Sequence, residues 1–315
     1  MTNLLSVVLP THNRAQQVLR AARSVLCQDV PALEVIIVDD ASTDDTPRVI
    51  DRLATEDRRV RLVSTEAGPV GPCHARNRGL ELAQGELVAF CDDDDTWTEE
   101  AGPAVLSALE ADPGLGAVSG WHRVLHTENG AQALYRGPTS YGASELMWQN
   151  FVGVPFGVIR RSTLSFDIGF DPDLPTGEDW DLWLRCAGER KIRTVPTVCY
   201  VYRQHGGSRV TAGMAAQIEG RRNFVSKHGA EMSSACRLFH QTILAGYEHG
   251  RPAMLRTVLA AGRRTPAQAG LVGMLVATST AASRAGVRRR DPGLQARIMA
   301  AMVKRLAPPD DGADG

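Results

Sequence analysis

The sequence contains a run of four consecutive carboxylates, Asp92 to Asp95, directly after an apolar stretch that reads as a buried strand. Like charges packed this closely raise one another's pKa and repel unless a cation lies among them. Ligands that are all oxygen suit a hard divalent ion such as Mg²⁺ or Mn²⁺. The run therefore predicts a divalent-metal site, and a solvated acidic turn that caps the following helix is the alternative.

A second pair of acids, Asp39 and Asp40, ends another apolar stretch and precedes the turn residues Ser42 to Asp45. A carboxylate at a strand end can accept the N3 hydrogen of uracil or bind a ribose hydroxyl. Paired acids also occur in Mg²⁺-binding receiver domains that accept a phosphoryl group, and simple capping of the next helix would place acids here too. By itself this pattern leaves all three readings open.

Three later features could act on the same ligand. Arg76 lies early in an expected helix, where a guanidinium could meet a phosphate or a base. Glu178, Asp179 and Asp181 surround the start of another helix, and an ionised acid there could act as a general base worth roughly 10² to 10⁴ in rate. His205 lies on a glycine-flanked loop and could complete a metal site of mixed ligands. An exposed arginine, an N-cap acid and an exposed histidine are the plain alternatives.

The elements that must position these residues alternate between strand and helix. We expect strands at residues 4–9, 34–38, 60–63 and 86–91, and helices at 15–27, from 46, and at 73–83. This alternation predicts a doubly wound, mostly parallel sheet flanked by helices. Ligands bind at the carboxyl ends of parallel strands, where Thr11 to Asn13, Asp39 and the run from Asp92 all lie. Three strand ends should therefore converge on one site.

The rest of the chain is expected to form an acceptor half and a helical region. Residues 121–149 read as polar and irregular, whereas 152–159 and 193–202 read as strands around the helix after Asp179. Beyond about residue 211 the pattern is helical, with breaks at Gly250, Pro252, Pro266 and Gly286. We expect one domain at 1–210, divided into a nucleotide-binding half (1–120) and an acceptor half (121–210), then a helical region at 211–307 and a disordered tail at 308–315.

Composition narrows the choice of partners. The 315 residues carry a net charge of -1, so no basic field points to nucleic acid. Six cysteines lack any C-x-x-C spacing, and the N-terminus does not resemble a signal peptide, which together favour the cytoplasm. Residues 265–283 are uncharged but rich in Gly, Ala, Ser and Thr, which favours a buried or membrane-apposed helix over a spanning one. Peripheral contact of the C-terminal helices with the inner face of a membrane stays open.

Four blocks, in order, resemble family 2 glycosyltransferases, which are inverting enzymes of the GT-A fold: VVLPTHNR, VIIVDDASTDDT, ARNRGLELAQGELVAFCDDDDTW and GEDWDLWLRC. The first two are similar to the family's nucleotide-contacting loops, the third to the helix that leads into its D-x-D metal motif, and the fourth to its catalytic E-D segment. The resemblance covers about residues 4–210. It implies a Rossmann-like GT-A domain with a C-terminal helical appendage.

The resemblance also implies roles for individual residues. Asp179 would be the catalytic base, and Asp94 and His205 would bind a divalent metal, Mn²⁺ or Mg²⁺. The register of the D-x-D motif stays open by one residue. The donor, a nucleotide diphosphate sugar and most simply a UDP-sugar, would be held by Pro10, Thr11, Arg14, Asp39, Asp40, Arg76, Asp92 and Asp93. Of the adjacent acids Asp39 and Asp40, Asp39 is the one expected to contact the nucleotide base.

Two other classes of protein would use a similar pocket. A nucleotide-sugar-binding protein would hold the same ligand without turnover, although it would not need a base at Asp179. A nucleotidyltransferase usually has a glycine-rich, Arg/Lys-containing phosphate loop after the first strand, whereas this chain has PTHNRAQ. Neither the acceptor, which could be a saccharide, a lipid-linked sugar or a natural product, nor the oligomeric state follows from the sequence.

Overall fold

The computed structural model describes residues 4–65, 68–150, 152, 156–164, 169–174, 176–188, 190–204, 214–262 and 273. Three expectations concern residues outside these ranges. They are the metal ligand His205, the uncharged segment 265–283 apart from Gly273, and the disordered tail 308–315. The same holds for the predicted helix breaks at Pro266 and Gly286.

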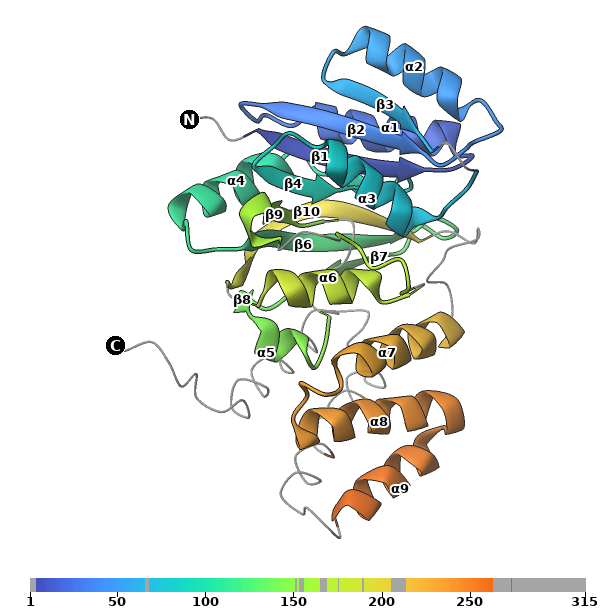
Figure 1. Cartoon of the computed structure of the whole chain (residues 1–315), viewed down its shortest axis with the longest axis vertical. Coiled ribbons are helices and arrows are strands. Elements are labelled where there is room, and N and C mark those ends of the chain that lie inside the picture. The colour runs from blue at the N-terminus through green and yellow to red at the C-terminus, as the bar shows by residue number, and fades with distance from the viewer. Residues whose placement is uncertain are drawn as a thin grey trace.

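The N-terminal half is the predicted parallel sheet with helices between its strands (Figure 1). Its strands are β1 (Leu5–Thr11), β2 (Leu33–Asp39), β3 (Val60–Ser64) and β4 (Leu87–Phe90), and its helices are α1 (Ala15–Leu26), α2 (Thr46–Glu56) and α3 (Pro72–Leu82). The strands lie in the order β3-β2-β1-β4, all parallel. Every residue of β1 and β2 is buried, as expected for central strands covered on both faces.

The second half extends this sheet in the order β4-β9-β6-β10-β5. Its elements are β5 (Thr96–Trp97), α4 (Ala101–Ala111), β6 (Ala117–His126), β7 (Gln132–Tyr135), β8 (Ser140–Tyr141), α5 (Ala143–Leu146), β9 (Val158–Arg160), the 3₁₀ turn η1 (Arg161–Thr163), α6 (Glu178–Cys186) and β10 (Ile192–Gln204). Strand β9 runs antiparallel to both of its neighbours, whereas β6 and β10 are parallel to each other. The sheet is therefore mostly parallel, as predicted, with antiparallel insertions.

Two expectations for this half are wrong in detail. Residues 121–149, expected to be irregular, contain most of β6 together with β7, β8 and α5. Strands β6 and β7 form a hairpin whose turn includes Gly130 at φ 67° and whose residues are largely half-buried or exposed, so no apolar run marks them. The strand expected at 152–159 is short, and among the described residues only Val158–Arg160 is extended and paired.

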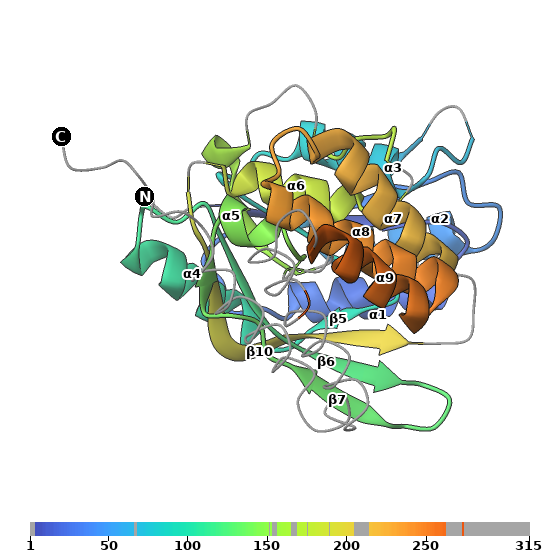
Figure 2. The same ribbon diagram turned by 90° about the horizontal axis from the view of Figure 1, so that it is seen from below.

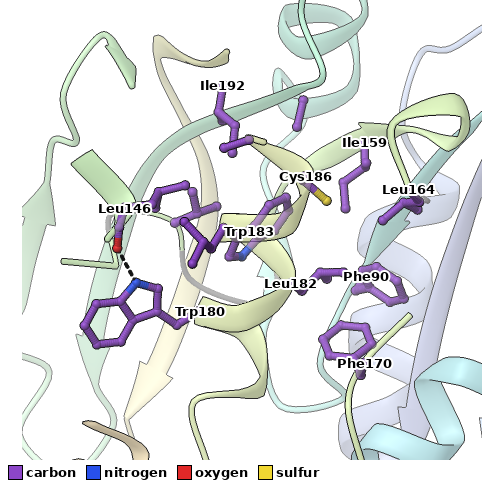
Figure 3. Packing of buried hydrophobic residues seen from close by; sticks show 14 of the residues in the cluster. Phe90, Leu146, Ile159, Leu164, Phe170, Trp180, Leu182, Trp183, Cys186 and Ile192 are labelled. Atoms are coloured by element: carbon purple, nitrogen blue, oxygen red, sulfur yellow. Dashed lines mark hydrogen bonds between the residues drawn. The ribbon is translucent and has the colours of Figure 1, made fainter. Parts of the chain in front are cut away.

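The sheet separates two apolar layers. Helices α1, α2 and α4 pack on one face, against Leu5, Val7 and Leu9 of β1, while α3 and α6 pack on the face that carries Val8. Figure 3 shows the α6 side, where Leu182 and Trp183 lie among side chains from the sheet and Phe90 meets the edge of Phe170 at 4.9 Å between ring centroids. Burying both faces of the central strands fixes their register, and with it the positions of the polar residues at their ends.

Three helices follow the sheet: α7 (Met214–His228), α8 (Ser234–His249) and α9 (Arg251–Gly262). They lie one after another at the end of the molecule opposite α2 (Figure 1). The predicted break at Gly250 is confirmed, with φ 76° between α8 and α9. Pro252 is not a break, because it lies in the first turn of α9, where its missing N–H costs no hydrogen bond. None of the helices in the described ranges has the length and hydropathy needed to cross a membrane.

The C-terminal helices share a core with α6. Trp180 stacks on Phe224 of α7 with 3.9 Å between ring centroids, and the fully buried Asp181 accepts hydrogen bonds from His228 Nε2 at 2.8 Å and Arg185 Nε at 2.9 Å. Lys227 Nζ lies 2.8 Å from the same carboxylate. Burial alone would raise the pKa of Asp181, but these hydrogen bonds and positive charges outweigh it and hold the pKa well below its usual range. The helical region is thus joined to the sheet domain by a buried charge cluster.

We predict that Asp181→Asn lowers the free energy of unfolding by about 2 kcal/mol or more at neutral pH, because it replaces a buried, charged acceptor of hydrogen bonds from His228 and Arg185 by a neutral amide. The folded pKa of Asp181 lies below its unfolded value of about 3.9, so its stabilisation is present above about pH 4 and is lost as the pH falls further. Urea unfolding of both proteins across this range measures the difference, with the exposed Asp173→Asn as control. Equal unfolding midpoints at neutral pH would contradict the prediction.

Candidate functional site

The predicted polar residues meet at the carboxyl edge of the parallel strands. Thr11 and Asp39 end β1 and β2 and face each other in register, and the run from Asp92 follows β4. The hydroxyl of Thr11 donates to Asp93 Oδ2 at 2.7 Å, which ties the end of β1 to the acid run. Pro10, one residue earlier, is buried within β1 opposite Val38, so its contribution is to the shape of the strand end.

The four acids divide into two kinds. Asp92, Asp94 and Asp95 each present a carboxylate oxygen, and these oxygens lie within 4.8 Å of one another. Asp93 points elsewhere, because its oxygens accept hydrogen bonds from Thr11 and from Arg14 NH1, the latter at 2.7 Å. Three converging oxygens fit a hard divalent cation, so this arrangement can hold the predicted metal. The sequence predicted Asp94 as a metal ligand, and Asp92 and Asp95 are the other candidate ligands among the described residues. The second predicted ligand, His205, lies outside these residues.

Neighbouring groups hold these acids in place. Arg14 NH1 also lies 3.1 Å from Asp94 Oδ2, and the backbone N–H of Arg203 on β10 donates to Asp95 Oδ1 at 2.8 Å. Burial raises the pKa of Asp93, although the charge of Arg14 and the hydrogen bond from Thr11 oppose it. Residues of the loop after β1 and of strand β10 therefore hold the acid cluster in position.

Arg76 connects the acid cluster to α6. Only 5% of this residue is exposed, and its NH2 donates to Asp92 Oδ1 at 2.7 Å while its NH1 donates to Glu178 Oε1 at 3.3 Å. Its guanidinium also lies 5.1 Å from the ring centroid of Phe170. Burial would lower the pKa of Arg76, but Asp92 and Glu178 outweigh it and raise the pKa. Arg76 was predicted at the site, but its contact with Glu178, 102 residues away, was not.

The start of α6 presents two adjacent carboxylates in different surroundings. Glu178 is buried, and burial together with the charge of Asp179 raises the pKa of Glu178 to about 7. Asp179 is half-buried; its Oδ2 accepts from Asn150 Nδ2 at 2.9 Å and its Oδ1 from the backbone N–H of Trp180 at 2.8 Å. Asn150 was missed by sequence reasoning, since nothing in its local pattern marks it.

Asp39 and Asp40 have different environments. Asp40 Oδ1 accepts from Thr65 Oγ1 at 3.0 Å and from the N–H of Val70 at 2.9 Å, and its Oδ2 accepts from the N–H of Gly71 at 2.8 Å. This carboxylate therefore secures the connection between β3 and α3. The buried Asp39 Oδ1 has no hydrogen-bond partner within the described chain, and Asp39 Oδ2 accepts only a long hydrogen bond of 3.4 Å from Ser42 N. Asp39 is thus the acid with spare acceptor capacity.

The loops after β1 and β2 are bonded to each other. Asn13 Oδ1 accepts from the N–H of Thr43 at 2.7 Å, and the N–H of Asn13 donates to Ser42 Oγ at 2.8 Å. Both Asn13 and Ala41 have positive φ angles, 52° and 55°, a conformation that is unfavourable for alanine. Strained backbone of this kind persists only where the surroundings enforce it, and it occurs often at ligand sites. The sequence predicted Asn13 at the edge of the site, but it did not show that Asn13 binds the loop after β2.

Comparison with known proteins agrees with this geometry. The family model for Glycosyl transferase family 2 matches residues 6–166, just over half of the chain. The Campylobacter jejuni protein named GalNAc(5)-diNAcBac-PP-undecaprenol beta-1,3-glucosyltransferase is 31% identical over 195 residues, which is 60% of this chain. The match covers 61% of that relative, so the chain spans less than two thirds of its length.

Solved structures share the fold. S. aureus TarS 1–349 in complex with UDP-GlcNAc has a TM-score of 0.63 at 17% identity, over 97% of this chain and 93% of that one. The mannosyltransferase PcManGT from Pyrobaculum calidifontis, in complex with GDP-Man and Mn²⁺, has a TM-score of 0.59 at 23% identity, over 96% of this chain and 86% of that one. Both are GT-A glycosyltransferases, so the predicted GT-A fold is confirmed.

We predict that Glu178→Gln changes how stability depends on pH. The folded protein binds the Glu178 proton more tightly, since its pKa is about 7 against about 4.3 in an unfolded chain. The contribution of Glu178 to the free energy of unfolding therefore falls as the pH rises through this window, by up to about 3 kcal/mol. Glutamine does not titrate, so the variant should gain stability relative to the wild type between about pH 5 and pH 8.

Urea unfolding at several pH values tests this difference. The exposed Glu81→Gln serves as the matched control, and its stability should run parallel to that of the wild type. If the stability of Glu178→Gln also depends on pH in the same way as that of the wild type, the pKa of Glu178 is not raised.

Proposed function

The chain belongs to glycosyl transferase family 2, and on that premise we propose that it transfers a sugar from a UDP-sugar to an acceptor hydroxyl with inversion of configuration. The observation that carries the proposal is the contact of one buried guanidinium, that of Arg76, with both Asp92 and Glu178. This contact holds the acid cluster and the start of α6 together, so a donor bound at the acids would lie beside Asp179. A binding protein without turnover would not need that arrangement.

We propose that the nucleotide lies across the ends of β1 and β2. Asp39 would accept the N3 hydrogen of uracil, because its buried Oδ1 has acceptor capacity that no described residue uses. Asp40 would act indirectly, through the connection between β3 and α3 that it secures. The TarS structure with the same fold holds UDP-GlcNAc, which supports a uridine nucleotide here, although PcManGT holds GDP-Man.

The carboxylates of Asp92, Asp94 and Asp95 would hold the divalent cation, Mn²⁺ or Mg²⁺, with His205 as a further predicted ligand outside the described residues. When bound, this cation would offset the negative charge that develops on the departing diphosphate. Arg14 contacts Asp93 and Asp94 and would keep the cluster in shape. Both terminal nitrogens of Arg76 contact carboxylates, so we propose that it positions Asp92 rather than touching the diphosphate.

Asp179 is proposed as the catalytic base. The hydrogen bonds from Asn150 and from the N–H of Trp180 fix the orientation of its carboxylate. Asp179 would accept the proton of the acceptor hydroxyl as that oxygen attacks the anomeric carbon from the face opposite the leaving diphosphate. One displacement of this kind inverts the configuration. The printed name of the Campylobacter relative refers to a lipid-linked sugar, which makes such acceptors the first to test, ahead of free saccharides and natural products.

We predict that Asp179→Asn lowers kcat by about 10² to 10⁴ while donor KM changes little, because the base acts in the chemical step. Asp94→Asn and treatment with EDTA should abolish transfer by removing the cation. Release of UDP from a panel of UDP-sugars with Mn²⁺ measures all three, and Asp173→Asn is the exposed control. Full activity of both variants, or of the EDTA-treated enzyme, would overturn the mechanism. Tight donor binding without transfer to any acceptor would favour the binding protein.

We predict opposite effects from the two adjacent acids at the end of β2. Asp39→Asn should weaken UDP binding about tenfold or more, since it replaces a buried, charged acceptor by a neutral amide that has a single acceptor oxygen. Asp40→Asn should instead lower the melting temperature, because Val70 and Gly71 lose a charged acceptor for their N–H groups. Calorimetric titration with UDP and thermal unfolding separate the two effects. If Asp40→Asn weakens UDP binding and Asp39→Asn lowers the melting temperature instead, Asp40 is the acid that contacts the uracil base.

A further inference from the structure

The end of the molecule opposite α2 presents an apolar surface. Leu255 and Leu259 on α9 are each 60% exposed, more than any other large apolar side chain in the described ranges. They are four residues apart and therefore lie on the same side of the helix. Exposed Pro252, Arg256 and Ala260 share that side, which we call the outer face of α9.

The fold itself does not require this face to be apolar. The inner side of α9 already contributes to the core, where Met254, Val258 and Ala261 pack against its buried residues and Ala253 is 7% exposed. Figure 1 shows α9 at the end of the molecule, next to α8 and away from the parallel strands, and Figure 2, seen from that end, shows it in front of the sheet. Two leucines with most of their surface in water are a cost that a binding partner would remove.

The outer face of α9 carries one charged residue, Arg256, and the sequence around this helix is basic. Residues 249–290 contain eight arginines and no lysine, aspartate or glutamate, although the whole chain has a net charge of -1. Positive charge is therefore concentrated in this part of the sequence, and exposed Arg256 places one such charge beside the two leucines. A surface that combines apolar side chains with cations and lacks acids is complementary to an anionic lipid interface.

We propose that the outer face of α9 docks on an anionic lipid surface, with Leu255 and Leu259 entering the interface and Arg256 at the phosphate headgroups. A second copy of the chain fits less well, because a twofold contact would bring Arg256 against its own counterpart. The docking surface goes beyond the proposed transfer reaction. It also does not depend on that reaction, since neither donor nor acceptor takes part.

The test uses the full chain and sedimentation with vesicles of phosphatidylcholine, with and without phosphatidylglycerol. We expect binding only to the anionic vesicles, weakened by salt because exposed charges are screened. The double variant Leu255→Ser/Leu259→Ser and the single variant Arg256→Glu should each weaken binding about tenfold or more, through lost insertion and lost attraction respectively. Arg58→Glu, an exposed arginine between α2 and β3 at the other end of the molecule, should leave binding unchanged.

The high exposure of both leucines means that the variants should fold, and unchanged thermal unfolding and UDP binding confirm that they do. Three results would overturn the proposal. The first is equal sedimentation of the wild type with both kinds of vesicle, and the second is binding of the double variant as tight as that of the wild type. The third is a dimer, seen by light scattering after gel filtration, that the double variant loses while no vesicle binding occurs; this result would assign the face to a second copy.

Discussion

A single buried cation, the guanidinium of Arg76, makes the acidic centre of this molecule possible. Asp92 and Glu178 come from segments far apart in the chain, and both approach the same buried region. Bringing two carboxylates out of water without a cation would cost several kcal/mol for each charge. Arg76 offsets part of that cost for both, and the raised pKa of Glu178 shows that burial and Asp179 outweigh it there. Its place is fixed by close packing of α3 on the sheet: a Cβ at Gly79 would lie 2.3 Å from a methyl of Val8.

The same constraint recurs at two other groups of acids in this fold. Arg14 contacts Asp93 and Asp94, while Lys227 and Arg185 contact Asp181. Asp39 differs from these acids, because no described cation pairs with it and its buried Oδ1 has no hydrogen bond from any described residue. A buried acceptor without a donor lowers the stability of the protein when no ligand is bound, and it contributes to binding when a ligand donates a hydrogen bond to it. The distribution of partners thus separates acids that hold the structure together from an acid that is available for recognition.

Much of this could be read from the sequence because it depends on local patterns. The strands before Thr11, Asp39 and Asp92 are apolar runs with clear ends, and parallel strands bring such ends together. Local patterns could not show which three of the four adjacent acids converge, since that depends on contacts with distant residues, such as the hydrogen bond from Thr11 to Asp93. They also could not show Asn150 beside Asp179, or the β6–β7 hairpin, whose half-exposed residues give no apolar run.

The helices after the sheet looked like an appendage in the sequence, yet Asp181 on α6 takes two of its cationic partners, Lys227 and His228 Nε2 (when protonated), from α7. This affects how the chain can be exchanged between proteins during evolution. Recombination or truncation near residue 210 would separate a buried carboxylate from its partners and uncover the stacked ring of Trp180. Helix α8 packs on the same region, through Phe239 against Trp148 and His240 against Trp180. The catalytic half, α7 and α8 must therefore be inherited as one unit, and the nearest boundary at which foreign sequence could be joined lies beyond α8.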